Sequence, residues 1–396
     1  MSTGEPLRIV DFSTHLSGPL ASHLLAELGA DVIKVEHPIQ GDGNRGNEPK
    51  FHGVSDLHVA LNSGTRSISI STRSEHWTEV TGALTSWSDA VIVGSRPSDA
   101  ARRGLDYASL LKSNSKLVYC LVSGFGLAGP WADFKAHGQT MDALAGRVDI
   151  EWVDGQPQTK KGWRSAGAPL AGVFGAMGVL AGVTRRDRGG GPQFVHASIW
   201  DSAMWWNWRD VNSLANTQEP WHEYQSLGSR YAMYSTSDER ALLLCPLERV
   251  FWQNFCDLAG LSDEYRERGN WEHSMDFGYD DETPVIAAAV ATRSLNEWVT
   301  ELTKAEIPFA PILTLEEAMN SEHAEATGLL RGTMLPKGRA RISSSPVGIY
   351  QDQEDAESPA VEDLSSPPDL GAHNKEILGL LGLDDLQGVD LSGGLK

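Results

Sequence analysis

Cysteine is scarce in this sequence, and the three that it has form no metal-binding or disulfide pattern. Cys120, Cys245 and Cys256 are an odd number with no CxxC spacing, so neither a zinc site nor a disulfide framework is indicated. The N-terminus lacks a basic stretch followed by an apolar segment, and no run approaches the ~20 apolar residues that a membrane span needs. We therefore expect a cytoplasmic protein with reduced thiols, no metal and no membrane partner.

Basic residues are also few compared with acidic residues. Lys and Arg total 33 against 53 Asp and Glu, which gives a formal net charge of -20. Such a chain repels a nucleic-acid backbone, so nucleic acid is not expected as a partner. A polyanionic ligand would have to bind in a local basic pocket.

Short β-branched runs alternate with helical patterns through the first half of the chain. Strands are predicted near residues 7–12, 31–36, 67–71 and 89–94, with a helix between successive strands. This alternation predicts a parallel sheet with right-handed crossovers in a Rossmann-like, doubly wound α/β layer. No GxGxxG follows the first strand, so this layer need not hold a nicotinamide cofactor.

Composition changes in the second half. A helix of small residues is predicted from about residue 172 to 183, and residues 215–315 have the pattern of a small α+β domain. The length of 396 residues fits a large domain with a smaller one. The tail from about residue 340 is rich in Ser, Pro and Asp and is expected to be an extended arm.

Several strings occur in an order that is specific as a set. They are IVDFSTHLSGPLASHLLAELGADVIKVEHP, LNSGTRSISI, GPQFVHASIWDSA and LGAHNKEILGLLGL. Together they resemble the class III CoA-transferase (CaiB/BaiF) family, which also includes formyl-CoA transferase and α-methylacyl-CoA racemase. The resemblance implies acyl-CoA and a carboxylic acid as substrates, with no metal and no permanently bound cofactor.

The family fold is an interlocked dimer of ring-shaped subunits. The resemblance therefore implies that residues 1–210 form the first part of a large CoA-binding domain and residues 215–315 a small domain. Residues 320–396 would be a return segment and C-terminal arm that complete the large domain. The partner would be a second copy of the chain or a related chain that carries the family's aspartate.

Five basic residues match positions with which the family binds CoA. They are His37, Arg45, Arg66, Arg102 and Lys135. As a set they could neutralise the phosphates of CoA in an otherwise acidic protein. Taken singly, each could equally be a solvated surface charge or a charge at a helix end.

The family's nucleophile is an aspartate that attacks the thioester to form a mixed anhydride. Counting back without gaps from PQFVHAS places Ala168 at this position, and Gly138 takes the other acidic position. An alanine methyl group cannot attack a thioester. Asp142 lies one helical turn from Gly138 and could substitute, or it could be a capping or surface residue.

The related racemases imply a second use of the same positions. His137 matches their catalytic histidine, and Glu248 the glutamate that orients it. A histidine held by a carboxylate is a reasonable general base, although it could equally make a structural hydrogen bond. Three hypotheses follow: a CoA-transferase without the usual aspartate, a non-catalytic subunit of a heteromeric transferase, or an enzyme that moves an α-proton with His137 and Glu248.

Overall fold

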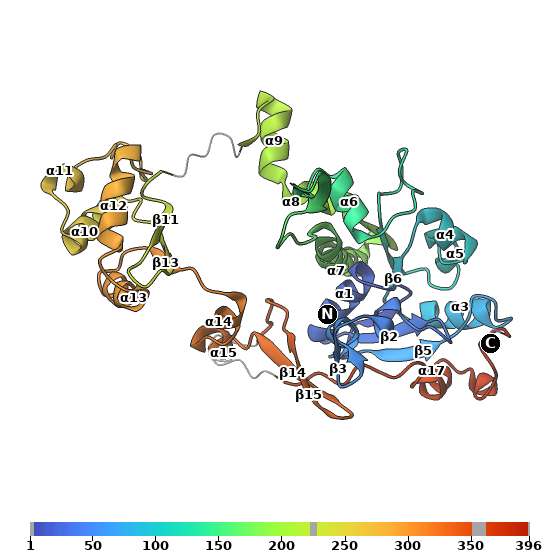
Figure 1. Cartoon of the computed structure of the whole chain (residues 1–396). Coiled ribbons are helices and arrows are strands. Elements are labelled where there is room, and N and C mark those ends of the chain that lie inside the picture. The colour runs from blue at the N-terminus through green and yellow to red at the C-terminus, as the bar shows by residue number, and fades with distance from the viewer. Residues whose placement is uncertain (1–3, 222–227, 351–361, 395–396) are drawn as a thin grey trace. The chain divides into compact units, whose positions relative to one another are not determined.

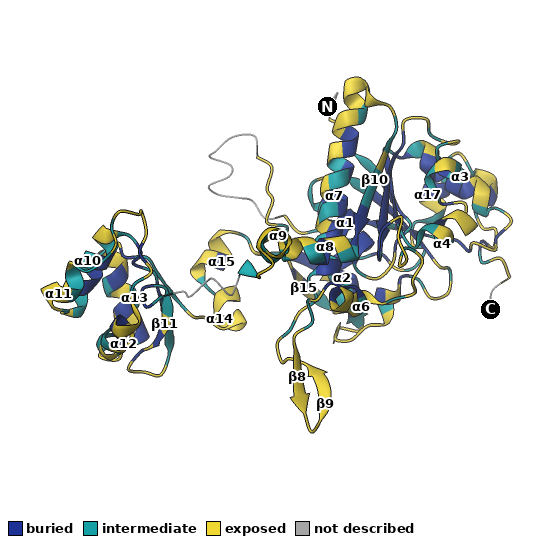
Figure 2. Ribbon diagram, turned by 90° about the horizontal axis from the view of Figure 1, so that it is seen from above, coloured by how far each residue is buried: buried dark blue, intermediate teal, exposed yellow. Residues whose placement is uncertain are grey.

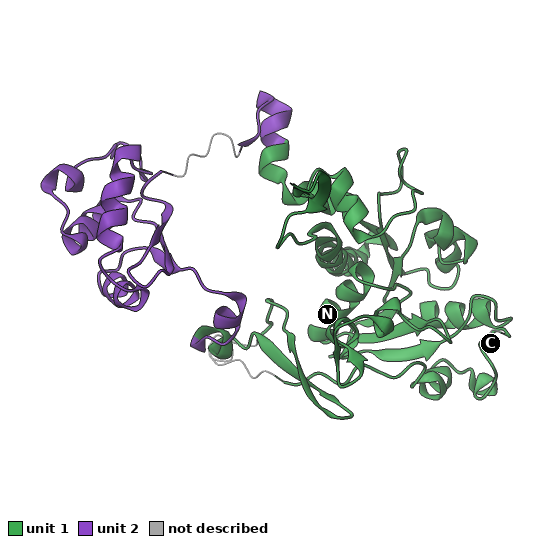
Figure 3. Cartoon of the chain, in the orientation of Figure 1, with its two compact units in different colours: residues 1–211, 323–396 green, residues 212–322 purple. Residues whose placement is uncertain are grey.

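The chain divides into two compact units. The computed structural model describes residues 4–221, 228–350 and 362–394, so residues 351–361 of the predicted arm lie outside the described residues. The first unit comprises residues 1–211 and 323–396, and the second comprises residues 212–322 (Figure 3). Each unit has its own hydrophobic core, and each is described by itself.

A six-stranded parallel sheet forms the centre of the first unit. Its order is β10-β7-β6-β1-β2-β5, and each neighbouring pair is parallel. The strands are β1 (Arg8–Asp11), β2 (Asp31–Glu36), β5 (Arg66–Ser69), β6 (Ala90–Gly94), β7 (Val118–Ser123) and β10 (Gln193–Ser198). Most of their side chains are buried, as expected for strands covered on both faces. The predicted doubly wound α/β fold is confirmed.

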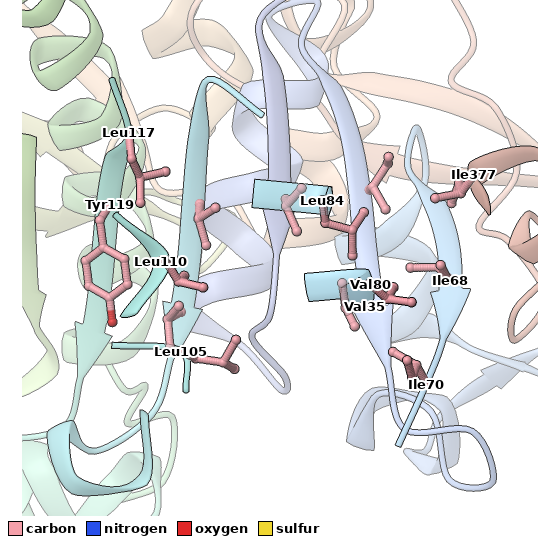
Figure 4. Packing of buried hydrophobic residues seen from close by; sticks show 14 of the residues in the cluster. Val35, Ile68, Ile70, Val80, Leu84, Leu105, Leu110, Leu117, Tyr119 and Ile377 are labelled. Carbon is pink, nitrogen blue, oxygen red and sulfur yellow. The ribbon is translucent and has the colours of Figure 1, made fainter. Parts of the chain in front are cut away.

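Helices cover both faces of this sheet (Figure 1). One face packs against α1 (Ser17–Glu27) and α7 (Gly167–Arg185). The other face packs against α3 (Trp77–Trp87), α4 (Pro97–Arg102), α5 (Tyr107–Leu110) and α17 (Asn374–Leu380). Figure 4 shows Val80 and Leu84 of α3 beside Val35 and Ile68 of the sheet, with Ile377 of α17 at the same core. The C-terminal helix thereby completes the layer that the N-terminal half begins.

The glycine-rich helix α7 packs very closely against its neighbours. A Cβ added at Gly172 would lie 2.7 Å from the backbone oxygen of Ser17, at the start of α1. Residues Gly167–Gly190 are long and apolar enough to cross a membrane by length and composition, and half of the most apolar window is buried. The expectation that no stretch approaches this length was therefore wrong for this segment. Its contacts with α1, β7 and β10 are those of a core helix.

Shorter elements complete the first unit, and two of them, α9 and α15, cross the boundary with the second. They are η1 (Gly43–Gly46), β3 (Lys50–Phe51), β4 (Val54–Ser55), α2 (Asp56–Asn62), α6 (Gly138–Leu144), β8 (Ile150–Val153), β9 (Gln156–Thr159), η2 (Arg186–Gly190), α8 (Ile199–Trp206), α9 (Trp208–Thr217), α15 (Glu322–Ala326), β14 (Leu330–Leu335), β15 (Gly338–Ser343) and η5 (Asp384–Leu386). The β14–β15 hairpin packs on α2 through a small apolar cluster. The β8–β9 hairpin is exposed along its whole length (Figure 2).

The second unit is a small α+β domain. Its antiparallel sheet has the order β11 (Ala232–Ser235), β12 (Ala241–Leu244) and β13 (Phe309–Pro311). Its helices are α10 (Arg249–Ala259), α11 (Asp263–Arg266), η4 (Asp280–Glu282), α12 (Thr283–Val290), α13 (Leu295–Lys304) and α14 (Leu315–Met319). Trp252, Phe255 and Trp298 fill its core. A fully buried ion pair between Arg230 and Glu282, at 2.6 Å, lies within this unit.

Candidate active site

A cavity of about 500 Å³ lies at the carboxyl edge of the parallel sheet. The chain continues from β1 to β2 on one side and later returns to β6 on the other, so β1 and β6 flank the switch point of the sheet. Open α/β sheets bind ligands in the crevice at this point. The lining residues are Thr14, His15, Leu16, Ser17, Gly18, Gly94, Ser95, Arg96, Val122, Ser123, Gly124, Phe134, Lys135, Ala136, His137, Gly138, Met141, Ala168 and Ile199.

A buried network of charges holds the loop between β1 and α1. The Lys34 ammonium lies 3.1 Å from the Asp11 carboxylate and 2.8 Å from that of Asp42. Burial lowers the pKa of Lys34, but the two carboxylates raise it by more, so the lysine stays charged. Asp42 accepts hydrogen bonds at 3.0 Å from the Thr14 hydroxyl and from the His15 backbone N–H. Strand β2 thereby fixes a loop that lines the cavity.

His15 stands out within this loop. Its φ is 71°, in the left-handed region that non-glycine residues rarely adopt. Its ring occupies the space where a Cβ on Gly43 would lie, because the Cβ would be within 2.6 Å of the ring atom Nδ1. A glycine at position 43 is therefore needed for this ring position. Strained residues of this kind are concentrated at functional sites.

The structure brings four of the residues singled out in the sequence to this cavity. Lys135, His137 and Gly138 come from the segment that leads into α6, and Ala168 is the second residue of α7. Ala168 is 4% exposed. A Cβ on Gly138 would extend into open space. Among the lining residues in the described part of the chain, none is Asp or Glu.

Asp142 does not line the cavity. It is fully buried, and its carboxylate accepts hydrogen bonds from the Ser165 hydroxyl at 2.5 Å, from Ala166 N–H at 3.3 Å and from Gly167 N–H at 3.1 Å. These groups lead into α7, so the carboxylate satisfies backbone donors at the start of that helix. These are the contacts of a capping residue, one of the roles left open by the sequence.

The other basic residues of the CoA prediction lie apart from the first cavity. His37 lines a second cavity of about 410 Å³, which shares Thr14 and His15 with the first. Arg45 and Arg66 line neither of these two cavities, and Arg102 extends from α4 with 67% of its side chain exposed.

Internal carboxylates bind two of these arginines. Arg45 makes a forked pair with Glu36, with distances of 2.8 and 2.7 Å. Arg66 bonds Asp31 at 2.6 Å and Glu376 at 2.7 Å. These pairs link β2, β5 and α17 to one another. The two arginines that the sequence analysis assigned to CoA binding are therefore already paired with carboxylates of the chain itself.

Arg96 is a lining residue that the sequence analysis missed. Its guanidinium donates to Asp99 at 2.8 Å and to the backbone oxygen of Asp133 at 3.0 Å. The available signal was its position, because it follows the carboxyl end of a buried strand where ligand-binding loops begin. With Lys135 it brings permanent positive charge to the lining, and Asp99 forms an ion pair with Arg96 at 2.7 Å.

Glu248 belongs to the second unit. It immediately precedes α10 and is partly exposed. Its pairing with His137 therefore stays a prediction from the sequence.

Comparisons with known proteins identify the family. The family model described as CoA-transferase family III matches residues 5–374. The chain therefore belongs to the class III CoA-transferase family.

Individual relatives span nearly the whole chain. The succinate–glutarate CoA-transferase of Agrobacterium fabrum is 26% identical, covering 95% of this chain and 94% of its own. The β subunit of a succinyl-CoA–L-malate CoA-transferase of Chloroflexus aurantiacus is 24% identical, with 97% and 96% covered. A crystal structure of a CaiB/BaiF family protein from Brucella suis has a TM-score of 0.73 at 24% identity, covering 95% of this chain and 98% of the other. The relationship to the CaiB/BaiF family expected from the sequence is confirmed.

Proposed function

We propose that this chain binds an acyl-CoA thioester in the cavity between β1 and β6 and transfers the CoA group to a carboxylic acid. The observation that carries this proposal is the charge of the lining. Arg96 and Lys135 line it together with His15 and His137, and no described lining residue is acidic. In a chain of net charge -20, this is a local site for anionic groups. Both CoA and the acceptor acid carry such groups.

Two features of the cavity suit a polyanionic ligand. The cationic side chains of Arg96 and Lys135 would neutralise carboxylate or phosphate oxygens. Ser17 and Gly18 line the cavity at the first turn of α1, where free backbone N–H groups and the helix dipole favour negative charge. The names of the relatives, which are CoA-transferases, support the choice of CoA thioesters.

The alanine at position 168 determines which group attacks the thioester in the proposed transfer. With Ala168 in the lining, the acceptor's own carboxylate would attack the thioester carbonyl. A C–O bond forms, the C–S bond breaks and CoA leaves as the thiolate. The thiolate then attacks the acceptor's carbonyl in the mixed anhydride, and the donor leaves as a free carboxylate. Both substrates would have to be bound together before a product leaves.

Initial-rate kinetics test this proposal. We expect the purified chain to bind CoA in a calorimetric titration, and to form a new CoA thioester from succinyl-CoA with glutarate, L-malate or oxalate as acceptor. Double-reciprocal plots should intersect, because in this route the acceptor attacks the thioester directly. Absence of CoA binding would overturn the proposal, and parallel lines would overturn the direct route, because they require transfer through an enzyme-bound intermediate.

Two variants with matched controls sharpen the test. Ala168→Asp should introduce a hydroxylamine-sensitive intermediate and parallel plots, whereas Ala181→Asp, on the exposed side of α7, should leave the plots intersecting. Lys135→Ala should weaken CoA binding about fivefold to tenfold, about 1–1.4 kcal/mol. Lys161→Ala, in the exposed segment after β9, should leave it unchanged. Equal losses for both lysine variants would contradict a local role for Lys135.

A second candidate is a subunit that binds acyl-CoA but depends on a partner for the nucleophile. The observation that favours it is the lack of a carboxylate among the described lining residues. A relative named as a β subunit supports it as well, and the alignment with this chain covers 96% of the length of that relative. Transfer would then be absent with the purified chain alone and would appear on mixing with a family member that has the aspartate. Transfer by the chain alone would exclude this candidate.

A further inference from the structure

A serine in the cavity is paired with a histidine on the neighbouring strand. Ser123 is the last residue of β7 and lines the cavity. Its Oγ lies 2.9 Å from Nε2 of His196 on β10. His196 is paired with Leu121 across the parallel strands, and side chains two residues apart share a face, so both groups lie on the same face of the sheet. The distance is within the range for transfer of a proton to a general base.

Backbone contacts leave the serine hydroxyl free to donate to this histidine. The Gly126 N–H donates to Ser123 Oγ at 3.1 Å, so the oxygen already accepts one hydrogen bond. Burial lowers the pKa of His196, and the nearby charge of Asp201 raises it by less. The imidazole is therefore neutral at neutral pH, and its Nε2 can accept the serine proton in the tautomer with hydrogen on Nδ1.

The turn after β7 allows an acid to approach this pair. Gly126 has φ +95°, a conformation that favours glycine. A Cβ on Gly126 would lie 3.9 Å from the Asp201 carboxylate and 3.9 Å from a ring carbon of His196. Both side chains therefore border this turn, and the charge of Asp201 acts on the imidazole. The arrangement is that of a serine, a base and a nearby acid, the components of an activated nucleophile.

We propose that Ser123 is the nucleophile of an acyl-CoA hydrolase activity of this cavity, with His196 as its general base. Ser123 Oγ attacks the thioester carbonyl, its proton passes to His196 Nε2, and the C–S bond breaks. The departing thiolate takes that proton and leaves as CoASH. Water then attacks the seryl ester, again losing a proton to His196, which returns it to Oγ as the acid leaves. The net reaction consumes one water for each acyl-CoA.

No carboxylate is found among the described lining residues, which makes this route chemically reasonable. With Ala168 and Gly138 in place of acidic groups, Ser123 is a lining residue whose oxygen contacts a base. Negative charge that develops on the thioester oxygen would be stabilised by the cationic lining. The inference rests on the proposed function in one respect, since acyl-CoA must occupy the cavity.

Thiol release tests the inference directly. Wild-type protein given succinyl-CoA or acetyl-CoA without an acceptor acid should release CoASH, measured with a thiol reagent. Ser123→Ala and His196→Gln should each lower this rate by about 10²–10⁴-fold, while the dissociation constant of CoA changes less than threefold. Controls outside the cavity lining, Ser113→Ala and His76→Gln, should hydrolyse at the wild-type rate. In acid-quenched samples, peptide mass spectrometry should locate the acyl group on Ser123.

A second readout does not depend on CoA. A fluorophosphonate probe should label Ser123 in wild type, label Ser123→Ala not at all, and react more slowly with His196→Gln. Labelling without CoA binding would overturn the proposed function and leave the nucleophile in place. CoA binding without thiol release, or an unchanged rate in Ser123→Ala, would overturn the hydrolase inference and leave the proposed function standing.

Discussion

Replacing Asp142 by alanine should destabilise the first unit without removing acyl-CoA binding. The carboxylate is buried and accepts hydrogen bonds from Ser165 Oγ and from the N–H groups of Ala166 and Gly167. Loss of a helix cap costs about 0.5–2 kcal/mol. Leaving buried donors unpaired adds about 1–3 kcal/mol. Because these effects overlap, we expect a total loss of about 3 kcal/mol.

The Asp142→Asn variant removes the negative charge of the side chain but keeps its size and its hydrogen-bonding groups. The amide oxygen can still accept from the two backbone N–H groups, and the amide nitrogen can donate to Ser165. What is lost is the attraction between a negative charge and the start of α7, together with the attraction to Arg147, whose Nε lies 3.9 Å from the carboxylate. The helix-end term is worth about 0.3–1 kcal/mol, up to about 2 kcal/mol where it is partly buried. We expect a loss of about 1–2 kcal/mol.

Differential scanning calorimetry measures both variants. At about 2 °C per kcal/mol for a unit of this size, Asp142→Ala should lower the melting temperature by about 6 °C and Asp142→Asn by about 3 °C. Asp149→Ala is the control, since Asp149 is exposed and close in sequence. A melting temperature within 1 °C of wild type, combined with loss of all acyl-CoA turnover, would show instead that Asp142 takes part in chemistry.

Three further predictions concern the packing around the two cores. Glu282→Ala should cost about 3–5 kcal/mol in unfolding titrations, because it leaves the Arg230 charge buried and unpaired, and replacing both residues by methionine should cost less. Burial raises the pKa of Glu36, but the hydrogen bonds and charge of Arg45, with hydrogen bonds from Ser67 and the Asp42 backbone, together lower it by more. The stability gap between wild type and Glu36→Gln should therefore be complete at pH 7 and shrink as pH falls below about 4.3; a constant gap would contradict this. Gly172→Ala should cost about 2 kcal/mol, since its Cβ would lie 2.7 Å from a backbone oxygen of α1; an unchanged melting temperature would show that the two helices can separate freely.

The local pattern of the sequence predicts the sheet well. Buried strands are apolar runs bounded by turn residues, so the predicted runs at residues 31–36 and 89–94 correspond to β2 (Asp31–Glu36) and β6 (Ala90–Gly94). The glycine-rich helix is longer than the predicted 172–183, because α7 begins at Gly167. Pro169 lies in the first turn, where its missing N–H is not needed.

The site is harder to predict because its contacts join distant parts of the chain. Matching to the family singled out Lys135, His137, Gly138 and Ala168, and the structure places all four at one cavity. It could not show that Arg45 is paired with Glu36, since any basic residue at the end of a strand has the same local pattern. The contact between Ser123 and His196 depends on which strands are neighbours, and no local pattern specifies that order.

The positive charges of the cavity lining and the negative net charge of the whole molecule have opposite effects on the rate at which an anionic ligand binds. Within the Debye length of the surface, about 8 Å at physiological ionic strength, an approaching CoA ester is repelled by a molecule with net charge -20. Only close to the carboxyl edge do Arg96 and Lys135 dominate. Added salt should therefore speed the encounter while it loosens the bound complex, so that association and dissociation both become faster.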